Sequence, residues 1–403
     1  MILCGDWAPG KMSVGAGKLI PNGDLRDCVL LNLEGPILPA DHALAPSPKA
    51  GPSLFSTAAP PGDGRLVCSL ANNHAMDYGE LGLALTREVL RARGALPVGA
   101  SATRAAAREP VFVNDRGANV AIIACCEAQF GAAELERSGV AAMGPWVPDA
   151  IRACRLKADA VVVSVHAGAE LAPWPAPVLQ DLYRSWIDAG ASVIHGHHPH
   201  TPQGFEEYGG GLILYGLGNL AVNPQDWDEY SNALWSLAAE VDLSAAPLRW
   251  GVRTLAVRGD GEGMEIVPDE EEDHAAYLAD CNRALADREL LEALWQEVAI
   301  RAYGAYYRTW LRFPQEKRGL RKRMPLACAA SAEHASGAGG ASRQDMRLWY
   351  HLFACQTHAD SIATALGVLC GELPDLRTAE TRTLVEQWMP RTIQQKATAE
   401  ALA

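Results

Sequence analysis

Residues 189–204 read AGASVIHGHHPHTPQG, which places four histidines within six positions directly after a short apolar run. Imidazole is a good donor near neutral pH, and clustered histidines are a common way to hold zinc, iron or manganese. Gly196 and Pro199 inside the run predict a tight loop, which can direct several rings toward one point. A polar, solvent-facing histidine tract is the competing interpretation, so the rest of the chain has to decide between the two.

Other polar groups occur at the ends of short apolar runs that are bounded by glycine or proline. Such runs predict buried strands. In open α/β sheets, the polar groups at the carboxyl ends of the strands converge in one crevice. Five strand ends of this kind therefore predict one shared site. The groups that end them are Asp6, Glu34, Asn72-Asn73-His74, His166 and the histidines of 195–200.

Length and charge limit the classes of protein to consider. The chain has 403 residues, 49% of them hydrophobic, and a net charge of −13. A chain this long exceeds one typical domain. We expect an α/β domain over 1–264 and a helical C-terminal region over 265–403. Without a long basic stripe, binding to nucleic acid is not expected. The basic cluster 317–323 predicts a solvated loop that could face an acidic substrate.

Cysteine usage and hydropathy suggest a compartment. The ten cysteines include no C-x-x-C pair, and Cys125 and Cys126 are adjacent in an apolar run, as expected for reduced thiols. No apolar stretch is long enough to span a bilayer, and no leader with an apolar centre precedes the first strand. We expect a cytoplasmic protein that binds neither membrane nor nucleic acid. The sequence leaves the oligomeric state open.

Strand-like and helical segments alternate up to about residue 258, and composition changes at the acidic segment 268–273. Residues 331–342 are rich in Ala, Gly and Ser and predict a flexible loop. The expected further strands are 119–124, 211–215 and 234–241, and the expected helices are 79–93, 177–189, 273–310, 346–369 and 378–389.

These motifs, taken in order, resemble the CapA-type family, which is named for poly-γ-glutamate capsule synthesis and is similar to the calcineurin-like metallophosphoesterases. The resemblance covers about residues 1–225, and the C-terminal third resembles no family. It implies a four-layer α/β/β/α sandwich with a metal centre between the sheets. The motifs that carry it are Gly5-Asp6, Asn32-Leu33-Glu34-Gly35-Pro36, Asn72-Asn73-His74 with Asp77 and Gly79, His166-Ala167-Gly168-Ala169-Glu170, Gly196-His197-His198-Pro199-His200 and Tyr215-Gly216-Leu217-Gly218-Asn219.

The resemblance implies one or two divalent ions (Mn, Zn, Fe or Ca). Glu34 would stand where such enzymes bridge two metals, and a metal-bound water there loses a proton near neutral pH. His74 would be the unligated acid or base beside the metals. The implied ligands are Asp6, Glu34, Asn73, His166, one of His197 and His198, and His200.

The chain departs from the family pattern at several positions. Ala8 stands where calcineurin-like enzymes carry a histidine, so the first metal site would be a ligand short and weak or empty. The bridging carboxylate is Glu34 rather than an aspartate. Lys11 stands where the family tends to have arginine, and it would either hold an anionic group or be a plain loop lysine. Most CapA-type proteins are membrane-anchored or exported, whereas we expect no anchor here.

Several further residues have both a functional and a structural interpretation. Glu170 would contact substrate or orient a ligating histidine, or be only a loop carboxylate. The amide of Asn219 would tie its loop to the site and help to bind substrate. Asn72 is expected to fix a turn, and His195 to form a strand-end hydrogen bond. Trp7, Trp146 and Trp174 would line an apolar groove or pack in the core. We expect a structural or surface position for four other histidines, His274, His334, His351 and His358.

Two classes of function follow, and a third serves as a check. The first is hydrolysis of a phosphoester, although a fold does not determine function. The second is acid/base chemistry on a peptide-like substrate, either amide cleavage or transfer or epimerisation at an α-carbon. The resemblance implies it because CapA-type proteins are linked to glutamyl polymers and a soluble branch includes a lasso-peptide epimerase. A non-catalytic metal-binding scaffold is the third class.

In the second class a metal would polarise a carbonyl group, while Asp6 and either His74 or His200 would move protons from opposite faces. The missing anchor and the incomplete first metal site favour this class. The scaffold is disfavoured because the Asp, Glu, Asn and His strand ends all occur together.

Overall fold

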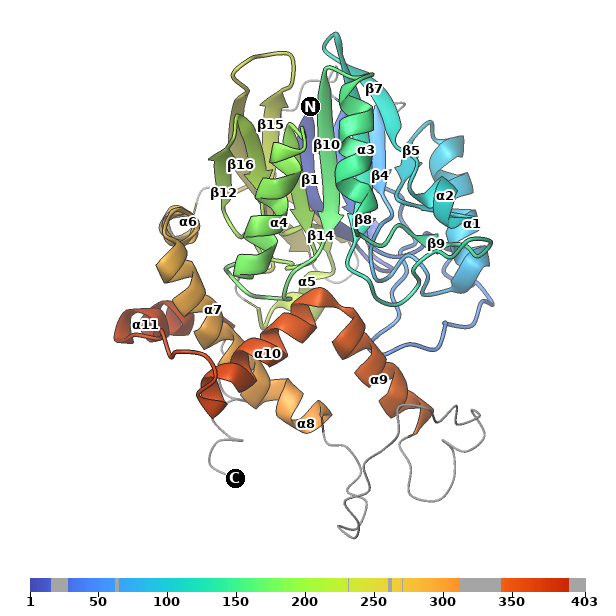
Figure 1. Ribbon diagram of the computed structural model, residues 1–403. Coiled ribbons are helices and arrows are strands. Elements are labelled where there is room, and N and C mark those ends of the chain that lie inside the picture. Colours follow the sequence, from blue (N-terminus) through green and yellow to red (C-terminus); the bar gives the residue numbers. More distant parts are fainter. Residues whose placement is uncertain are drawn as a thin grey trace.

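The computed structural model describes residues 1–15, 28–61, 65–230, 232–259, 263–269, 271–311 and 342–390. Two β-sheets pack face to face, with helices beside them and a group of C-terminal helices at one end (Figure 1). The basic cluster 317–323, His334 and most of the loop predicted over 331–342 lie outside the described residues.

The larger sheet contains the strand on which the chain begins. Its order is β2-β17-β16-β15-β1-β3-β4-β5, and β14 also pairs with β1. Strands β1, β3, β4 and β5 run parallel, so their carboxyl ends meet at one edge, where Asp6 lies in register with Asn32. The bounds are β1 Ile2–Ala8, β2 Ser13–Val14, β3 Val29–Leu33, β4 Leu66–Ser69, β5 Leu96–Val98, β14 Asn219–Val222, β15 Trp235–Asp242, β16 Arg249–Gly259 and β17 Gly263–Pro268.

The smaller sheet has the order β12-β13-β11-β10-β8-β7. Its three central strands are parallel and in register at their ends, where Cys126, His166 and His197 lie side by side. The bounds are β7 Val111–Asp115, β8 Ala118–Cys126, β10 Ala160–His166, β11 Val193–His197, β12 Phe205–Tyr208 and β13 Gly211–Leu214, and a separate pair joins β6 Ala100–Ser101 to β9 Gly139–Val140.

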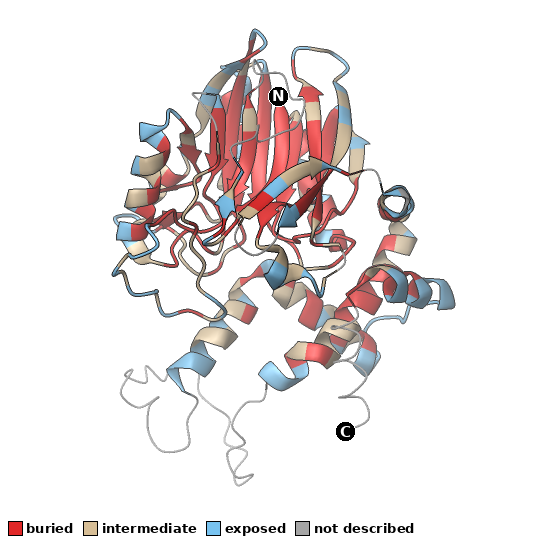
Figure 2. Cartoon of the chain, turned by 180° about the vertical axis from the view of Figure 1, so that it is seen from behind, coloured by how far each residue is buried: buried red, intermediate tan, exposed pale blue. Residues whose placement is uncertain are grey.

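Strand β8 shows why the central strands have continuous apolar sequences. Val120 and Ile122 pack into the core between the sheets, whereas Ala121 and Ile123 pack on the other side, in the cluster formed with helices α3 (Trp146–Arg155) and α4 (Pro177–Asp188). Successive side chains point to opposite faces, and both faces are buried. Helix α1 (Gly79–Ala92) packs beside β5. The predicted α/β sandwich with C-terminal helices is confirmed, and Figure 2 shows its buried strands.

The C-terminal region is helical in its described part, but it is more divided than the sequence indicated. The helix expected over 273–310 is broken at Asp287, whose side chain accepts a hydrogen bond from the amide of Leu290 and caps a new helix. A second break falls at Cys355, within the helix expected over 346–369. The division at residue 264 stays a prediction, and β17 continues the larger sheet to Pro268. The helices are α6 Glu272–Ala286, α7 Arg288–Ala302, the π-helical turn η1 Tyr303–Tyr307, α8 Arg308–Trp310, α9 Arg343–Ala354, α10 Gln356–Cys370 and α11 Ala379–Trp388.

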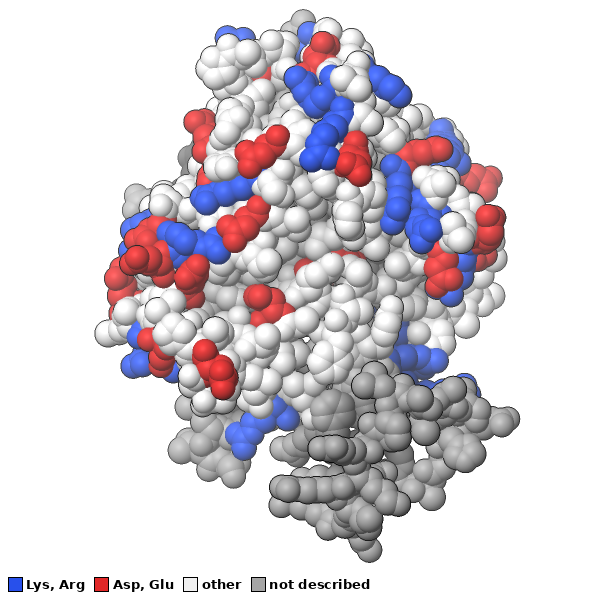
Figure 3. All heavy atoms as spheres, in the orientation of Figure 1, with Lys and Arg blue, Asp and Glu red and all other residues white. Residues whose placement is uncertain are grey.

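Within the described ranges, no helix combines the length and the apolar character needed to cross a bilayer. Acidic and basic side chains are interspersed on the face drawn in Figure 3, and its centre is largely uncharged.

The glycine inside the histidine run has a packing reason. A Cβ at Gly196 would lie 2.0 Å from the carbonyl oxygen of Tyr215, which directly follows β13. We expect Gly196→Ala to force β11 and β13 apart, to displace His197, and to lower the free energy of unfolding by about 1–3 kcal/mol or more. Thermal unfolding measures the change. Gly251→Ala in β16 is the control, because none of the described atoms lies within 4 Å of the position that its Cβ would take. Equal unfolding midpoints for the two variants would contradict this account.

Candidate metal centre

The carboxyl ends of strands from both sheets bring buried carboxylates and imidazoles together. Asp6 lies on β1 and Glu34 directly follows β3 in the larger sheet, while His166 and His197 end β10 and β11 in the smaller one. Each of these four residues is at most 1% exposed. The two sheets thus contribute to one polar cluster inside an apolar sandwich.

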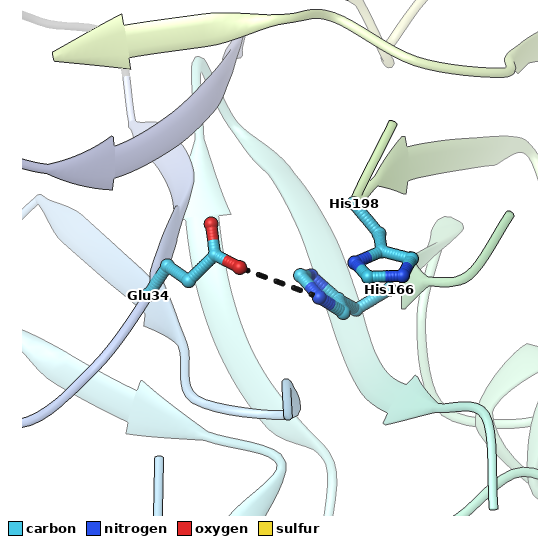
Figure 4. A group of neighbouring side chains, drawn as sticks. All are labelled: Glu34, His166 and His198. Atoms are coloured by element: carbon cyan, nitrogen blue, oxygen red, sulfur yellow. Dashed lines mark ion pairs between the residues drawn. The ribbon is translucent and has the colours of Figure 1, made fainter. Parts of the chain in front are cut away.

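Glu34 is the centre of this cluster. Its Oε1 lies 3.7 Å from His166 Nε2 and 3.6 Å from His200 Nε2. Figure 4 shows the carboxylate directed at His166, with the ring of His198 beyond it. The three residues Glu34, His166 and His198 can each offer a ligand atom within 4.8 Å of the others. The same holds for Asp6, Glu34 and His200, so Glu34 belongs to both groups.

The backbone of the histidine run bends sharply to direct its rings into the cluster. His198 and His200 have positive φ angles of 95° and 57°, which non-glycine residues adopt rarely. His197 Nδ1 lies 3.1 Å from Asp6 Oδ1, and His200 Nδ1 lies 3.5 Å from Asp6 Oδ2. Strained backbone of this kind is frequent at functional sites.

Buried amides hold several of these groups in place. Asn32 Nδ2 donates to Asp6 Oδ1 at 2.8 Å and lies 3.3 Å from His166 Nδ1. Asn219 Oδ1 lies 2.9 Å from His200 Nδ1, and its Nδ2 donates to the carbonyl of Ala233. The amide of Asn219 is therefore engaged within the protein, where it orients His200. Asn73 Oδ1 lies 2.8 Å from His166 Nε2, the ring nitrogen that faces Glu34.

Several buried polar atoms of the cluster have no hydrogen-bond partner among the described residues. They are both carboxylate oxygens of Glu34 and the Nδ1 atoms of His197 and His198. His195 Nε2 lies 2.9 Å from the carbonyl oxygen of Cys4 and donates to it, so His195 Nδ1 accepts from His197 Nε2 at 3.2 Å. The other ring nitrogen of His197, Nδ1, lies 3.1 Å from the carboxylate oxygen Oδ1 of Asp6. Unpartnered buried acceptors are costly, and a divalent cation would satisfy them together.

The pKa values of the cluster show the same electrostatic conflict. Burial raises the pKa of Glu34 to about 8, and the neighbouring carboxylates of Asp6 and Glu170 add to the rise. Burial lowers the pKa of His166 far below its usual value, and the nearby histidines lower it further. Burial alone would lower the pKa of His200, but the carboxylates of Glu34, Asp6 and Glu170 raise it to about 9. A bound cation would stabilise the charged carboxylates and the neutral imidazoles at once.

His74 lies beside the cluster and is held there by the carboxylate of Asp77. Its Nδ1 lies 2.7 Å from Asp77 Oδ2, and its Nε2 lies 4.0 Å from Glu34 Oε1. Because Asp77 is an acceptor, the proton of neutral His74 belongs on Nδ1, and Nε2 keeps its lone pair toward the site. The buried amine of Lys49 pairs with Asp77, lies 3.0 Å from His74 Nδ1 and donates to the carbonyl of Asn73.

The predicted substrate contacts lie in different surroundings. Glu170 is an exposed residue that forms a further group with His198 and His200, so it borders the centre at its solvent side. Lys11 is exposed, with its amine 5.5 Å from the centre of the Phe55 ring, outside the buried cluster.

Two tryptophans are not groove residues. Trp7 and Trp174 are fully buried, and Trp7 Nε1 donates to the carbonyl of Ala58, so both belong to the packed core. Trp146 is half-buried, and its indole N–H donates to the carbonyl of Ala142. The aromatic ring beside the cluster is Trp227, with a centroid 4.7 Å from that of His200.

Four other expectations have clear outcomes. Asn72 fixes its turn, because it donates to the carbonyl of Leu33 and accepts from the amide of His74. His195 forms the expected hydrogen bond at a strand end. His274 stacks on Trp235 and pairs with Asp269, a structural role. His351 and His358 are half-buried and form a hydrogen-bonded pair.

Sequence reasoning missed several residues of the site. Asn32 belongs to the motif Asn32-Leu33-Glu34-Gly35-Pro36, but no role was predicted for its amide, and Trp227 has no signature that separates it from an ordinary tryptophan. Lys49 lies 24 positions before Asn73 in a segment rich in proline and glycine, and only the fold brings its amine to His74. Asp77 follows the Asn72-Asn73-His74 motif by three residues, so a hydrogen bond to His74 was within reach of the sequence.

The model of the family described as bacterial capsule synthesis protein PGA_cap matches residues 14–224. The capsule biosynthesis protein CapA of Bacillus anthracis is 34% identical over 171 residues, which are 41% of this chain and 41% of that protein. The PGA biosynthesis protein CapA of Bacillus subtilis is 34% identical over 166 residues, covering 40% and 43%. A probable polyglutamine synthesis accessory protein of Mycobacterium tuberculosis is 33% identical over 168 residues, covering 38% and 44%. The chain thus spans less than half the length of these curated relatives.

Among solved structures, a phosphatase from Mycoplasma pneumoniae is 14% identical with a TM-score of 0.37, covering 63% of this chain and 92% of that one. A 5'-nucleotidase precursor from Thermus thermophilus is 15% identical with a TM-score of 0.31, covering 60% and 51%. Scores this low add nothing to what the two sheets themselves show. The family model, by contrast, spans more than half of the chain, including Glu34, His166 and the histidine run. This chain therefore belongs to the PGA_cap family of bacterial capsule synthesis proteins.

Proposed function

We propose that this protein is a metal-dependent enzyme that performs acid/base chemistry on a peptide-like substrate. The observation that carries the proposal is a set of buried polar groups left unpartnered in the described structure, on Glu34, His197 and His198, next to an imidazole, His74, that is held by its own carboxylate. The first feature suits a divalent cation, and the second suits a group that moves protons. A scaffold that only binds metal has no use for the His74–Asp77 pair.

The chain's residues would divide the work between binding and proton transfer. Asp6, Glu34, His166, His198 and His200 would hold the metal, with Asn73 and His197 as further donors. When bound, the metal supplies Lewis acidity toward a carbonyl oxygen and so acidifies the neighbouring α-proton or activates the amide.

His74 is placed to accept a proton on Nε2, with Asp77 stabilising the imidazolium that results. Asp6, through a carboxylate oxygen that the metal leaves free, or His200, where it is not a ligand, would act from the opposite face. The apolar core around the cluster limits access of water.

The relatives favour a substrate with amide bonds. The names of the bacillary and mycobacterial proteins refer to capsule, PGA and polyglutamine synthesis. A glutamyl polymer or a peptide natural product fits both these names and a site able to polarise a carbonyl. Epimerisation at an α-carbon and amide cleavage or transfer are the two reactions that this site would support. We place the activity in the cytoplasm, on a peptide or small molecule, without nucleic acid or membrane as a partner.

Phosphoester hydrolysis is the second candidate, and one observation favours it. Glu34 belongs to two ligand groups at once, which is the arrangement that bridges paired ions in a two-metal site. Ala8 argues against it, because the group with Asp6 and His200 then lacks a further imidazole from β1.

A side-by-side assay separates the two functions. The metal-loaded protein is incubated in deuterated water with a glutamyl oligomer or a candidate precursor peptide, and separately with p-nitrophenyl phosphate esters. We expect deuterium at a peptide α-carbon or a cleaved amide, lost on chelation, and slow turnover of the phosphoesters. Rapid metal-dependent phosphoester turnover, with neither deuterium uptake nor amide cleavage, would reject the peptide proposal in favour of the phosphoesterase.

A further inference from the structure

A buried carboxylate outside the metal centre joins the sandwich to the C-terminal helices. Glu127 follows β8 and is fully buried. Its Oε1 accepts from the amide of Thr357 at 2.9 Å and from the hydroxyl of Thr357 at 2.6 Å, and its Oε2 accepts from Cys355 Sγ at 3.0 Å. Cys355 and Thr357 lie at the start of α10, so a side chain of the sandwich caps a helix of the other region.

The same residue is bonded to the end of β10. The amide of Glu127 donates to the carbonyl of His166 at 3.1 Å. Burial raises the pKa of the Glu127 carboxylate, and the backbone of Gly168 lowers it. The loop after β10 continues to Glu170, which belongs to a ligand group with His198 and His200. Leu171, directly after it, has a positive φ of 60° and donates to the carbonyl of Pro199. Glu127 is therefore bonded both to the end of β10, from which the loop of Glu170 continues, and to the start of α10.

The first turn of α10 carries His358, which is bonded to two other residues of the C-terminal helices. His358 Nε2 lies 3.1 Å from His351 Nε2, and its Nδ1 lies 2.8 Å from the hydroxyl of Tyr307. Burial lowers the pKa of His358 to about 3, and the carboxylate of Glu170 opposes that shift. Glu170 acts on the pKa of His351 in the same direction. The charge of Glu170 thus acts both on the histidines of the strand-end centre and on the histidine pair of the helices.

We propose that Glu127 is a positioning residue that holds α10, and with it His358, against the loop of Glu170, so that the C-terminal helices form one wall of the metal centre. A buried carboxylate is expensive unless donors surround it, and here the donors are the thiol of Cys355 and the amide and hydroxyl of Thr357 at the start of α10. This inference shares one assumption with the proposed function, namely that the strand-end cluster is a metal centre.

Hydrogen exchange of the full chain tests the contact without any metal. In Thr357→Val we expect amides of both 167–172 and 356–360 to exchange about tenfold faster, because a hydrogen bond to a charged group is worth about 1.5–3 kcal/mol. Thr357→Ser should restore protection in both segments, and Glu127→Gln should expose both. Asp360→Asn is the matched control, since Asp360 accepts a hydrogen bond from Trp295 in α7. It should affect α10 and leave 167–172 protected.

A second measurement reports position rather than stability. Mn²⁺ in the strand-end centre should broaden the ring signals of His358, identified by their loss in His358→Asn. The broadening should weaken in Thr357→Val and return in Thr357→Ser. An unchanged 167–172 segment in Thr357→Val, equal opening in Asp360→Asn, or bound Mn²⁺ without broadening at His358 would each overturn the proposal. If the wild type holds no Mn²⁺, the proposed function fails and the exchange data alone decide this inference.

Discussion

Glu34→Gln is expected to abolish metal binding while making the metal-free protein more stable. Glu34 takes part in two of the candidate ligand groups, and both of its oxygens are buried without a hydrogen-bond partner in the described part of the chain. Replacement of residues behind metal ligands already costs 10–100-fold in affinity. Loss of this carboxylate should therefore cost more than about 100-fold. Burial raises the pKa of Glu34 to about 8, so without metal this carboxylate must take up a proton when the chain folds at neutral pH. The amide removes that cost, and the variant should therefore unfold at a higher temperature than metal-free wild type.

Two measurements test the predicted loss of metal and the predicted gain in stability of the metal-free protein. Elemental analysis after reconstitution gives the metal content, and thermal unfolding with and without chelator gives the stability. Glu206→Gln is the control, because Glu206 accepts hydrogen bonds from Arg184 and Tyr215 away from the cluster. It should keep its metal. Full metal content in Glu34→Gln would remove this residue from the ligand set.

His74→Ala is expected to lose catalysis by about 10²–10⁴-fold while keeping its metal, because general acid–base catalysis contributes an effect of that size. His74 Nε2 faces the cluster at 4.0 Å from Glu34, and Asp77 holds the other nitrogen. The loss should appear in kcat, with a small change in KM, since the residue moves a proton and does not anchor the substrate.

His42→Ala provides the comparison for His74→Ala. His42 packs edge-on against Phe55 and Tyr78, and it should retain nearly full activity. Deuterium uptake at the peptide α-carbon gives the rate for both variants, and metal analysis confirms equal loading. If His74→Ala kept the wild-type rate at equal loading, another group would have to be the base.

The fold was predictable because local patterns and packing agree. Apolar runs such as 160–165 are buried on both faces of the smaller sheet, so burial, β-branching and length all indicate a strand. Asp6 and Glu34 lie close together because parallel strands of the larger sheet end at one edge. His166 and His197 meet in the same way in the smaller sheet. The packing of one sheet on the other then brings the two pairs together. The breaks at Asp287 and Cys355 were not predictable in the same way, because apolar spacing continues across them and the capping contacts decide.

The supporting residues of the site could not be predicted from the sequence, because contacts between distant segments place them. Nothing near Lys49 indicates that its amine will be buried beside His74, and nothing near Glu127 indicates a partner 230 positions later in the chain. In the sequence, His358 is an ordinary helical residue, yet the start of its helix is bonded to Glu127, which follows β8. Such contacts are set by how whole elements pack, and a pattern within one segment carries no information about them.

Because ligands come from the strand ends of both sheets, an ion bound among them acts as a cross-link between two layers that otherwise adhere through apolar contacts. By thermodynamic linkage, whatever separates the layers weakens the ion's hold, and the ion in turn opposes their separation. Core residues such as Leu31 in β3 and Val162 in β10, which belong to none of the candidate ligand groups, then become determinants of metal affinity. The dissociation constant of the metal therefore depends on how tightly the two sheets pack against each other.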